Sequence, residues 1–291
     1  MSNRKWKICV IGGGVVGLAS ALSIRDLNIG TETVDVTVIA EQFGRDVTSS
    51  VAAGLLEPYS VGMFNYHHKK SNSYSLPLGT GDYTHWSEGA RSRSITLFKL
   101  LSTKLSVVSR YGYRFTTLMA NPLAEEYDVI VNCTGVGAAK FNDARVQPGR
   151  GQVTKVHAQW IKHHVVAEKA NGEVSYILPC PDFVALGGVV QKGNWNRDVC
   201  PDDKKQIWEG CCQLIPSLRD AKIIEDRVGL RPLRDEVRLE SEQITTPIGK
   251  KWVVHNYGHG GAGVTLHWGC GKEAAKLVKD CLERVALQSK L

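Results

Sequence analysis

A glycine-rich turn between two apolar stretches constrains the fold of this chain more than any other feature. Residues 6–11 predict a buried strand, and residues 18–24 place Ala and Leu at helical spacing. The turn between them is Gly12-Gly13-Gly14-Val15-Val16-Gly17, and residues 35–40 predict a second buried strand. Strand, turn, helix and strand in this order predict a βαβ unit of the Rossmann-like type, and hence an α/β protein.

Each glycine of Gly12-x-Gly14-x-x-Gly17 has a physical role in dinucleotide binding. Gly12 permits the tight turn, Gly14 lets the backbone approach a pyrophosphate, and Gly17 lets the helix pack against the strand. The N–H groups of Val15 and Val16, at the helix N-terminus, supply partial positive charge for the phosphates. We therefore expect these five residues to bind the cofactor.

Glu41 ends the second predicted strand, 24 residues after Gly17. A carboxylate there accepts hydrogen bonds from ribose hydroxyls and repels a 2′-phosphate. The motif by itself fits FAD and NAD equally, so an NAD-dependent dehydrogenase is one alternative. A glycine-rich turn beside a surface glutamate is the purely structural one.

A second glycine-rich turn lies near the other end of the chain, within residues 254–265. Four glycines there precede an apolar, helix-like run, and such a turn presents several backbone N–H groups to one anionic point. In a flavoenzyme that point would be the N1–C2=O2 edge of the reduced flavin. The structural alternative is a glycine-rich loop that holds two histidines in the core, His255 and His259.

Composition excludes several other classes. The chain has 291 residues and a formal net charge of +7, but its basic residues are interleaved with acidic ones, so we do not expect nucleic-acid binding. The eight cysteines form no CxxC pair, which argues against a zinc site and suits a reducing compartment. No apolar run approaches the roughly 18 residues of a membrane span, and no signal peptide is expected.

The motifs together resemble those of the D-amino-acid oxidases, a family that includes D-aspartate oxidase. The two glycine-rich turns match its first and last signatures, the second continuing into His267-Trp268-Gly269-Cys270. The other matching motifs follow in family order: Val51-Ala52-Ala53-Gly54-Leu55, Glu57-Pro58-Tyr59, Val131-Asn132-Cys133-Thr134-Gly135, Gln147-Pro148-Gly149-Arg150-Gly151-Gln152, Leu186-Gly187-Gly188, Gly193-Asn194-Trp195 and Gly229-Leu230-Arg231-Pro232.

The resemblance implies FAD as the cofactor and the oxidation of a D-amino acid to an imino acid, with O2 as electron acceptor. Hydrolysis then gives a 2-oxo acid and ammonia, and H2O2 is the second product. The family pattern adds further cofactor-binding residues, which are Ser50, Ala53, Gly54, Thr134, Gly260, Gly263, Val264 and Thr265.

Three residues are expected to bind the substrate by the same resemblance. A guanidinium holds a carboxylate through a bidentate fork, and Arg231 is the family's arginine for this role. Tyr176 is its partner, and the backbone carbonyl of Gly261 accepts from the substrate amine. No side chain is expected as an acid or base catalyst, because positioning does most of the work. Structurally, Arg231 could instead pair with Asp235 or Glu236, and Tyr176 could be a core residue.

The resemblance also implies a division into two domains. Residues 1–59, 127–149 and 251–291 would form a discontinuous FAD-binding domain, and residues 150–250 a substrate domain built on a mixed sheet. Residues 60–126 form a shortened, diverged segment, since only 68 residues separate Tyr59 from Asp128. A truncated, non-catalytic family member is therefore a further alternative.

Substrate choice depends on two positions. The acidic-substrate branch carries an arginine at the position of Val190. The valine here therefore favours neutral D-amino acids, whereas Gly172 fits the D-aspartate oxidase branch. Lys169 is a candidate substitute cation.

Ser289-Lys290-Leu291 matches the peroxisomal address read by an import receptor, with the cytosol as the alternative location. A homodimer is also expected.

Overall fold

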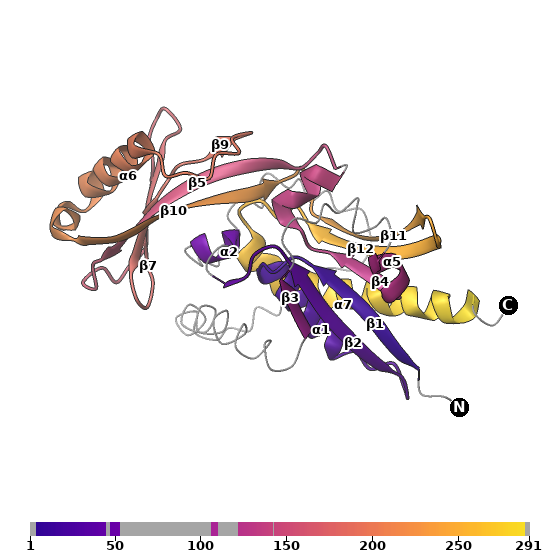
Figure 1. Cartoon of the computed structure of the whole chain (residues 1–291). Coiled ribbons are helices and arrows are strands. Elements are labelled where there is room, and N and C mark those ends of the chain that lie inside the picture. Colours follow the sequence, from indigo (N-terminus) through magenta and orange to yellow (C-terminus); the bar gives the residue numbers. More distant parts are fainter. Residues whose placement is uncertain (1–3, 45–46, 53–105, 110–121, 142, 289–291) are drawn as a thin grey trace.

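The computed structural model describes residues 4–44, 47–52, 106–109, 122–141 and 143–288 (Figure 1). Among these residues the chain forms two six-stranded sheets, each with its own helical cover. Both termini of the described chain lie at the same end of the molecule, away from α6 (Figure 1). The mixed α/β architecture confirms the predicted fold class.

The first sheet has the strand order β11-β12-β4-β1-β2-β3 within the described residues. All neighbouring pairs are parallel except β11 and β12, which are antiparallel. Its strands are β1 (Lys5–Ile11), β2 (Thr33–Ala40), β3 (Ser106–Ser109), β4 (Val129–Asn132), β11 (Arg238–Thr246) and β12 (Gly249–Tyr257). Short helical segments precede or follow some of these strands: α2 (Thr48–Val51), α5 (Pro122–Glu126) and the 3-10 helix η3 (Gly135–Phe141).

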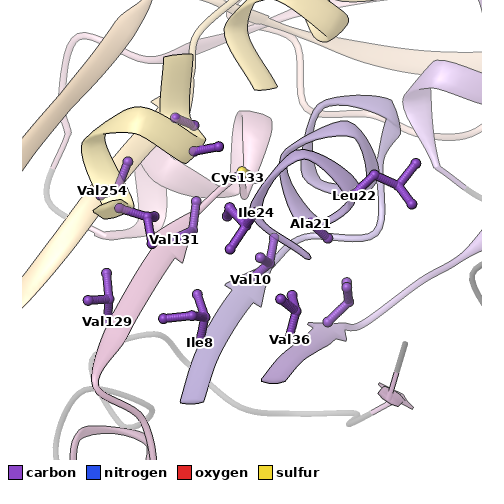
Figure 2. Packing of buried hydrophobic residues seen from close by; sticks show 14 of the residues in the cluster. Ile8, Val10, Ala21, Leu22, Ile24, Val36, Val129, Val131, Cys133 and Val254 are labelled. Carbon is purple, nitrogen blue, oxygen red and sulfur yellow. The ribbon is translucent and has the colours of Figure 1, made fainter. Parts of the chain in front are cut away.

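Two helices, α1 (Val15–Arg25) and α7 (Gly263–Gln288), cover one face of the first sheet. Figure 2 shows apolar side chains of α1 packed on the valines and isoleucines of β1, β2, β4 and β12. Ala274, Ala275 and Val278 of α7 belong to the same buried cluster. A Cβ at Gly271 would lie 2.9 Å from the Ala19 carbonyl carbon, so glycine lets α7 approach the α1 backbone closely. This packing joins the C-terminal helix to the N-terminal βαβ unit.

The second sheet was expected to be mixed, but all its strand pairs among the described residues are antiparallel. Its strand order is β10-β5-β8-β7-β6, with β9 paired to β5. Figure 1 shows β5 and β10 running side by side from the region of α6 toward the first sheet. The elements are β5 (Gln147–His157), β6 (Val165–Glu168), β7 (Val174–Pro179), β8 (Val184–Gly187), β9 (Gln191–Lys192), α6 (Pro201–Leu214), the 3-10 helix η4 (Pro216–Asp220) and β10 (Lys222–Leu233).

The domain boundary differs from the one expected. The substrate domain was expected to cover residues 150–250, but β11 lies in the first sheet. The physical reason is the tight hairpin that joins β11 to β12, which carries both strands into the same sheet. The second sheet therefore extends from Gln147 to Leu233.

Three helical expectations from the residue pattern need correction. The pattern of residues 202–218 predicts one helix, but α6 ends at Leu214 because Pro216 interrupts it. The pattern of residues 272–287 predicts a closing helix, and α7 contains it but begins earlier, at Gly263. The pattern of residues 95–108 predicts a helix, but residues 106–109 form β3, and residues 95–105 lie outside the described residues.

Candidate active site

The first glycine turn lies at the carboxyl edge of the parallel sheet, where cofactors bind in open α/β sheets. Gly12 has φ +122°, and a Cβ there would lie 2.2 Å from the Cys133 carbonyl oxygen. A Cβ at Gly17 would lie 2.0 Å from the Gly12 carbonyl oxygen. Both positions therefore exclude any larger residue. At Gly14 the nearest atom is Ser49 Oγ at 3.6 Å, so the protein leaves room above this residue.

The N-terminus of α1 is open to an anion. Its N-cap is Gly14, which has no side chain to cap it, and its first turn carries no acidic residue. The Val15 N–H donates to Ser49 Oγ at 3.1 Å, and the N–H of Val16 lies in the same turn. The N–H groups of this first turn, beside the open space at Gly14, form a cradle that fits a pyrophosphate. Ser49 itself was not expected from the sequence; the Thr48-Ser49-Ser50 run after the second strand was its available signal.

Two further cofactor candidates, Glu41 and Thr134, follow strand ends at the same edge, and a third, Ser50, lies in α2. Glu41 is exposed and follows directly on β2. Thr134 follows β4 and donates from its N–H and its hydroxyl to Asn132 Oδ1, at 3.2 and 2.8 Å. Since Ile11 is paired with both Ile39 and Asn132, these strand ends are adjacent to the Gly12 turn. Ser50 is exposed and donates to the Gly44 carbonyl. Ala53 and Gly54 lie outside the described residues.

The second glycine turn links β12 to α7. We call residues 258–262 the closing turn. Gly258 and Gly260 have φ of +87° and +54°, which favours glycine at both positions. The Gly260 N–H donates to the Pro232 carbonyl at 2.9 Å, and this bond ties the closing turn to the end of β10. Gly261 is exposed at the apex. The first residues of α7, which are Gly263, Val264 and Thr265, are half-buried and follow directly.

His259 is the buried polar side chain of the closing turn. Its exposed fraction is 2%, and its Nε2 atom has no hydrogen-bond partner among the described residues. Burial, with a smaller contribution from His267, lowers the pKa of His259 to about 4. The imidazole is therefore neutral at physiological pH and is held in the interior as an uncharged ring.

Arg231 and Tyr176 lie on the same face of the second sheet. Alternate residues of a strand share a face, as do directly paired residues of neighbouring strands. Arg231 is paired with Gly149 of β5, and Tyr176 is paired with Gly187 of β8. Because Gly187 is in turn paired with Val153, which alternates with Gly149, both side chains are on one face.

Glycines beneath these two side chains let them lie flat on the sheet. A Cβ at Gly151 would lie 2.1 Å from Arg231 Nη1, and a Cβ at Gly187 would lie 2.2 Å from the Tyr176 hydroxyl. Gly151 is a diagonal neighbour of Gly187 across β5 and β8, and such neighbours are about 7–8 Å apart. The guanidinium therefore lies over Gly151 and the hydroxyl over Gly187, at diagonally neighbouring positions of one sheet face.

This face of the second sheet is directed toward the first domain. Gly229 is on the same face as Arg231, two residues earlier in β10, and a Cβ there would lie 3.3 Å from Thr48 and Val51 of α2. The Thr48 hydroxyl also donates to the Leu230 carbonyl at 3.2 Å. The Arg231 guanidinium donates to the Val189 carbonyl at 3.5 Å. No ion pair joins Arg231 to Asp235 or Glu236 in the part of the chain that the structure describes.

The opposite face is covered by α6 and holds Arg150. Its side chain is 1% exposed, and it donates to Gln152 Oε1 and the Asp198 carbonyl and pairs with Asp203 of α6. Through these bonds the Arg150 side chain holds the segment that leads into α6. Arg150 is therefore a structural residue of the second sheet.

The three residues expected to bear on substrate choice, Val190, Lys169 and Gly172, lie in two different places in the second sheet. Val190 is 56% exposed and follows Val189, whose carbonyl accepts from Arg231. Lys169 is exposed in the β6–β7 hairpin and pairs with Glu173 at 2.9 Å. Gly172 is in the same hairpin with φ +81°. Among the described residues, no cluster of His, Cys, Asp or Glu could hold a metal ion, and no helix is long and apolar enough to cross a membrane.

Comparison with known proteins identifies relatives of this chain. Residues 103–277 match the family model described as FAD dependent oxidoreductase. The D-aspartate oxidase of Homo sapiens is 31% identical over 331 residues, covering 95% of this chain and 95% of that protein. The D-amino acid oxidase of Dugesia ryukyuensis is 31% identical over 343 residues, covering 96% of this chain and 99% of that protein. Both alignments exceed the 291 residues of this chain, so the relatives contain residues that it lacks.

Solved structures show the same fold. The glycine oxidase from Bacillus cereus has a TM-score of 0.63 at 17% identity, covering 94% of this chain and 95% of that one. The family match agrees with the two-sheet fold and with the glycine turn at the carboxyl edge of the first sheet. The chain belongs to the FAD-dependent oxidoreductase family of the D-amino-acid and D-aspartate oxidases.

Proposed function

We propose that this protein catalyses the oxidative deamination of D-amino acids. One D-amino acid, one O2 and one water give a 2-oxo acid, ammonia and H2O2. Membership of the family supports an FAD-dependent amino-acid oxidase, and the names of the relatives support the D configuration. Bound FAD supplies the acceptor for the hydride that leaves the substrate α-carbon.

The observation that carries the proposal is that Arg231 and Tyr176 lie on one face of the second sheet, over the neighbouring glycines Gly151 and Gly187. A guanidinium fork and a phenol hydroxyl provide two charge-assisted donors for one carboxylate. Their face is directed toward α2 and the cofactor-binding edge, where the α-carbon must be presented.

The amine end of the substrate is assigned to the Gly261 carbonyl. The closing turn is bonded to β10 through Gly260 and Pro232, next to Arg231 in sequence. A carbonyl that accepts from the amine and a guanidinium that binds the carboxylate fix two of the substituents on the α-carbon. Two fixed substituents orient the α-hydrogen, and this orientation distinguishes the D from the L enantiomer.

The proposal is tested by measuring three products from the purified, FAD-loaded protein. D-Alanine should yield pyruvate, ammonia and H2O2 in equal amounts, and L-alanine should yield none. Arg231→Leu should retain FAD but lose turnover, because the substrate carboxylate loses its charged partner. Gly269→Ala is the matched control, since nothing lies within 4 Å of a Cβ at that exposed position on α7. Equal oxidation of both enantiomers, or an active Arg231→Leu variant, contradicts the proposal.

Neutral D-amino acids are the substrates that the site favours. A substrate with a second carboxylate needs a second cation, because an unpaired buried carboxylate costs several kcal/mol. Val190 offers none, and Lys169 is already paired with Glu173. D-Aspartate is the second candidate, favoured by the likeness to human D-aspartate oxidase.

The cellular location and the assembly state belong to the proposal too. Ser289-Lys290-Leu291 lies outside the described residues, and its match to the peroxisomal address supports import by the peroxisomal receptor. A product such as H2O2 suits that compartment. Deleting Leu291 should leave a tagged protein in the cytosol, and an unchanged punctate pattern would contradict the assignment. Homodimerisation is checked by light scattering of the purified protein.

A further inference from the structure

A buried polar cluster lies where three segments meet beside the closing turn. Asp143 follows η3, Arg234 follows β10, and Tyr257 ends β12. Asp143 is 7% exposed, Tyr257 is 2% exposed, and the Arg234 side chain is 4% exposed. We call these three residues the corner cluster. The cofactor and substrate contacts assigned above include none of them.

The carboxylate of Asp143 is at the centre of the corner cluster. Its Oδ2 accepts from Arg234 Nε at 3.0 Å and from the Tyr257 hydroxyl at 2.9 Å, and its Oδ1 accepts from the Arg145 N–H at 3.1 Å. Burial alone would raise the pKa of Asp143, but the hydrogen bonds from Tyr257, Arg145 and Arg234 outweigh burial and hold it below its ordinary value. The group is therefore a buried carboxylate that accepts hydrogen bonds from three donors.

The corner cluster also contacts the closing turn directly. The Arg234 side chain lies over Gly258, where a Cβ would come within 2.9 Å of Arg234 Cδ. Gly258 also has φ +87°, a backbone conformation that favours glycine, so both the contact with Arg234 and the backbone require glycine there. Together with the Gly260–Pro232 hydrogen bond, this contact holds the closing turn against the end of β10 at two points.

The positions of these residues along the chain connect the cluster to the substrate site. Arg231 precedes Arg234 by three residues on one side, and Gly261 follows Tyr257 by four residues on the other. The corner cluster therefore lies between the chain segments that carry Arg231 and Gly261, the groups assigned to the two ends of one substrate.

We propose that Asp143 is a positioning residue of the active site, which acts through Arg234 and Tyr257 to set the distance between Arg231 and Gly261. This inference deepens the proposed function and rests on it. Small misplacements of groups around a reacting centre lower rates by up to about a hundredfold. Loss of the cluster should therefore lower the rate of the reaction more than it lowers the affinity for a ligand that carries only the carboxylate.

The test compares two ligands in the FAD-loaded protein. Propionate carries only a carboxylate, whereas D-alanine carries the carboxylate and the amine. In Asp143→Asn we expect propionate affinity within about threefold of wild type, and a fall of about tenfold or more in the limiting rate of anaerobic flavin reduction by D-alanine. The FAD dissociation constant, a readout that needs no turnover, should be unchanged within about threefold, since less than 0.7 kcal/mol separates such values.

Asp203→Asn is the matched control, because Asp203 forms a second buried pair with an arginine, Arg150, on the opposite face of the second sheet. It should lower the melting temperature without lowering the limiting rate. Tyr257→Phe is the milder second variant, which removes one hydroxyl and should lower the limiting rate in the same direction should Asp143→Asn not fold.

Two results would overturn the inference. One is a limiting rate in Tyr257→Phe and Asp143→Asn equal to that of Asp203→Asn; the other is an equal loss of propionate and D-alanine binding. Failure of the proposed function would be recognised separately, because wild type itself would then not be reduced by D-alanine.

Discussion

The guanidinium of Arg231 rests on the backbone of Gly151, so closely that a Cβ there would lie 2.1 Å from Nη1. Backbone, rather than a neighbouring carboxylate, therefore determines where this cation lies. Its Nη1 also donates to the Val189 carbonyl, which leaves the guanidinium uncompensated by negative charge among the described residues. A cation held in this way is prepared for an anionic ligand.

Gly151→Ala should weaken substrate binding without removing the cofactor. The methyl group would displace the guanidinium, and a loss of about 1.4 kcal/mol or more raises the KM for D-alanine by about tenfold. Steady-state kinetics and the flavin content of the purified variant check this. Gly269→Ala serves as the control, and an unchanged KM in Gly151→Ala would show that the guanidinium is not held by this contact.

The glycines of the first turn should separate into two kinds. Gly17→Ala should lower both the melting temperature and the flavin content, because its Cβ would lie 2.0 Å from the Gly12 carbonyl oxygen. Gly14→Val should leave the fold of the cofactor-free protein intact and weaken FAD binding, since only Ser49 Oγ, at 3.6 Å, is near. Thermal melts with and without FAD distinguish the two, and unchanged flavin content in Gly14→Val contradicts the cradle.

Stability should fall as the pH is lowered from about 6.5 toward 4. The pKa of His259 is about 4 in the folded chain, so between these values the unfolded chain binds the additional proton and unfolding is favoured. For His259, the lowering of the pKa from 6.5 to about 4 corresponds to a loss of about 3 kcal/mol in the free energy of unfolding across this pH range. The pKa values of His255 and His267 are lowered as well, mainly by burial, and act in the same direction.

The measurement is the free energy of unfolding by urea between pH 7 and pH 4.5. His259→Leu should flatten the profile relative to wild type, because the leucine cannot take up a proton. An unaltered slope in this variant would mean that His259 is not buried as the neutral form.

Val190→Arg should shift preference toward D-aspartate. Val190 follows the residue whose carbonyl contacts Arg231, so an arginine there adds a cation close to the substrate-binding face. One added charge pair of about 1.4 kcal/mol raises the ratio of kcat/KM for D-aspartate over D-alanine about tenfold. Lys169→Met should leave this ratio unchanged, because Lys169 pairs with Glu173. A wild-type preference for D-aspartate that disappears in Lys169→Met would reverse the assignment.

The cofactor-binding unit was largely predictable because its signals are local. The strand, glycine turn and helix at residues 6–24 follow from spacing alone, and the reasons for Gly12 and Gly17 appear in the structure as close backbone contacts. The position of β11 was not predictable in this way. Its sheet is decided by pairing with β12, and strand periodicity does not reveal which sheet a hairpin joins.

The substrate site depends on register, which the sequence does not display. That Arg231 and Tyr176 share a face follows only from the pairing of β10, β5, β8 and β7. The same holds for Asp143, which is 91 residues from Arg234 and 114 from Tyr257 in sequence. Contacts over such separations in sequence are determined by tertiary packing, and no local sequence pattern predicts them.

The measurement that tests the account most directly is the visible spectrum of the purified protein under anaerobic conditions. The account predicts the absorption bands of oxidised flavin, which bleach on addition of D-alanine and persist on addition of L-alanine. A colourless protein that cannot be loaded with FAD, or a flavin spectrum that D-amino acids leave unchanged, would contradict it.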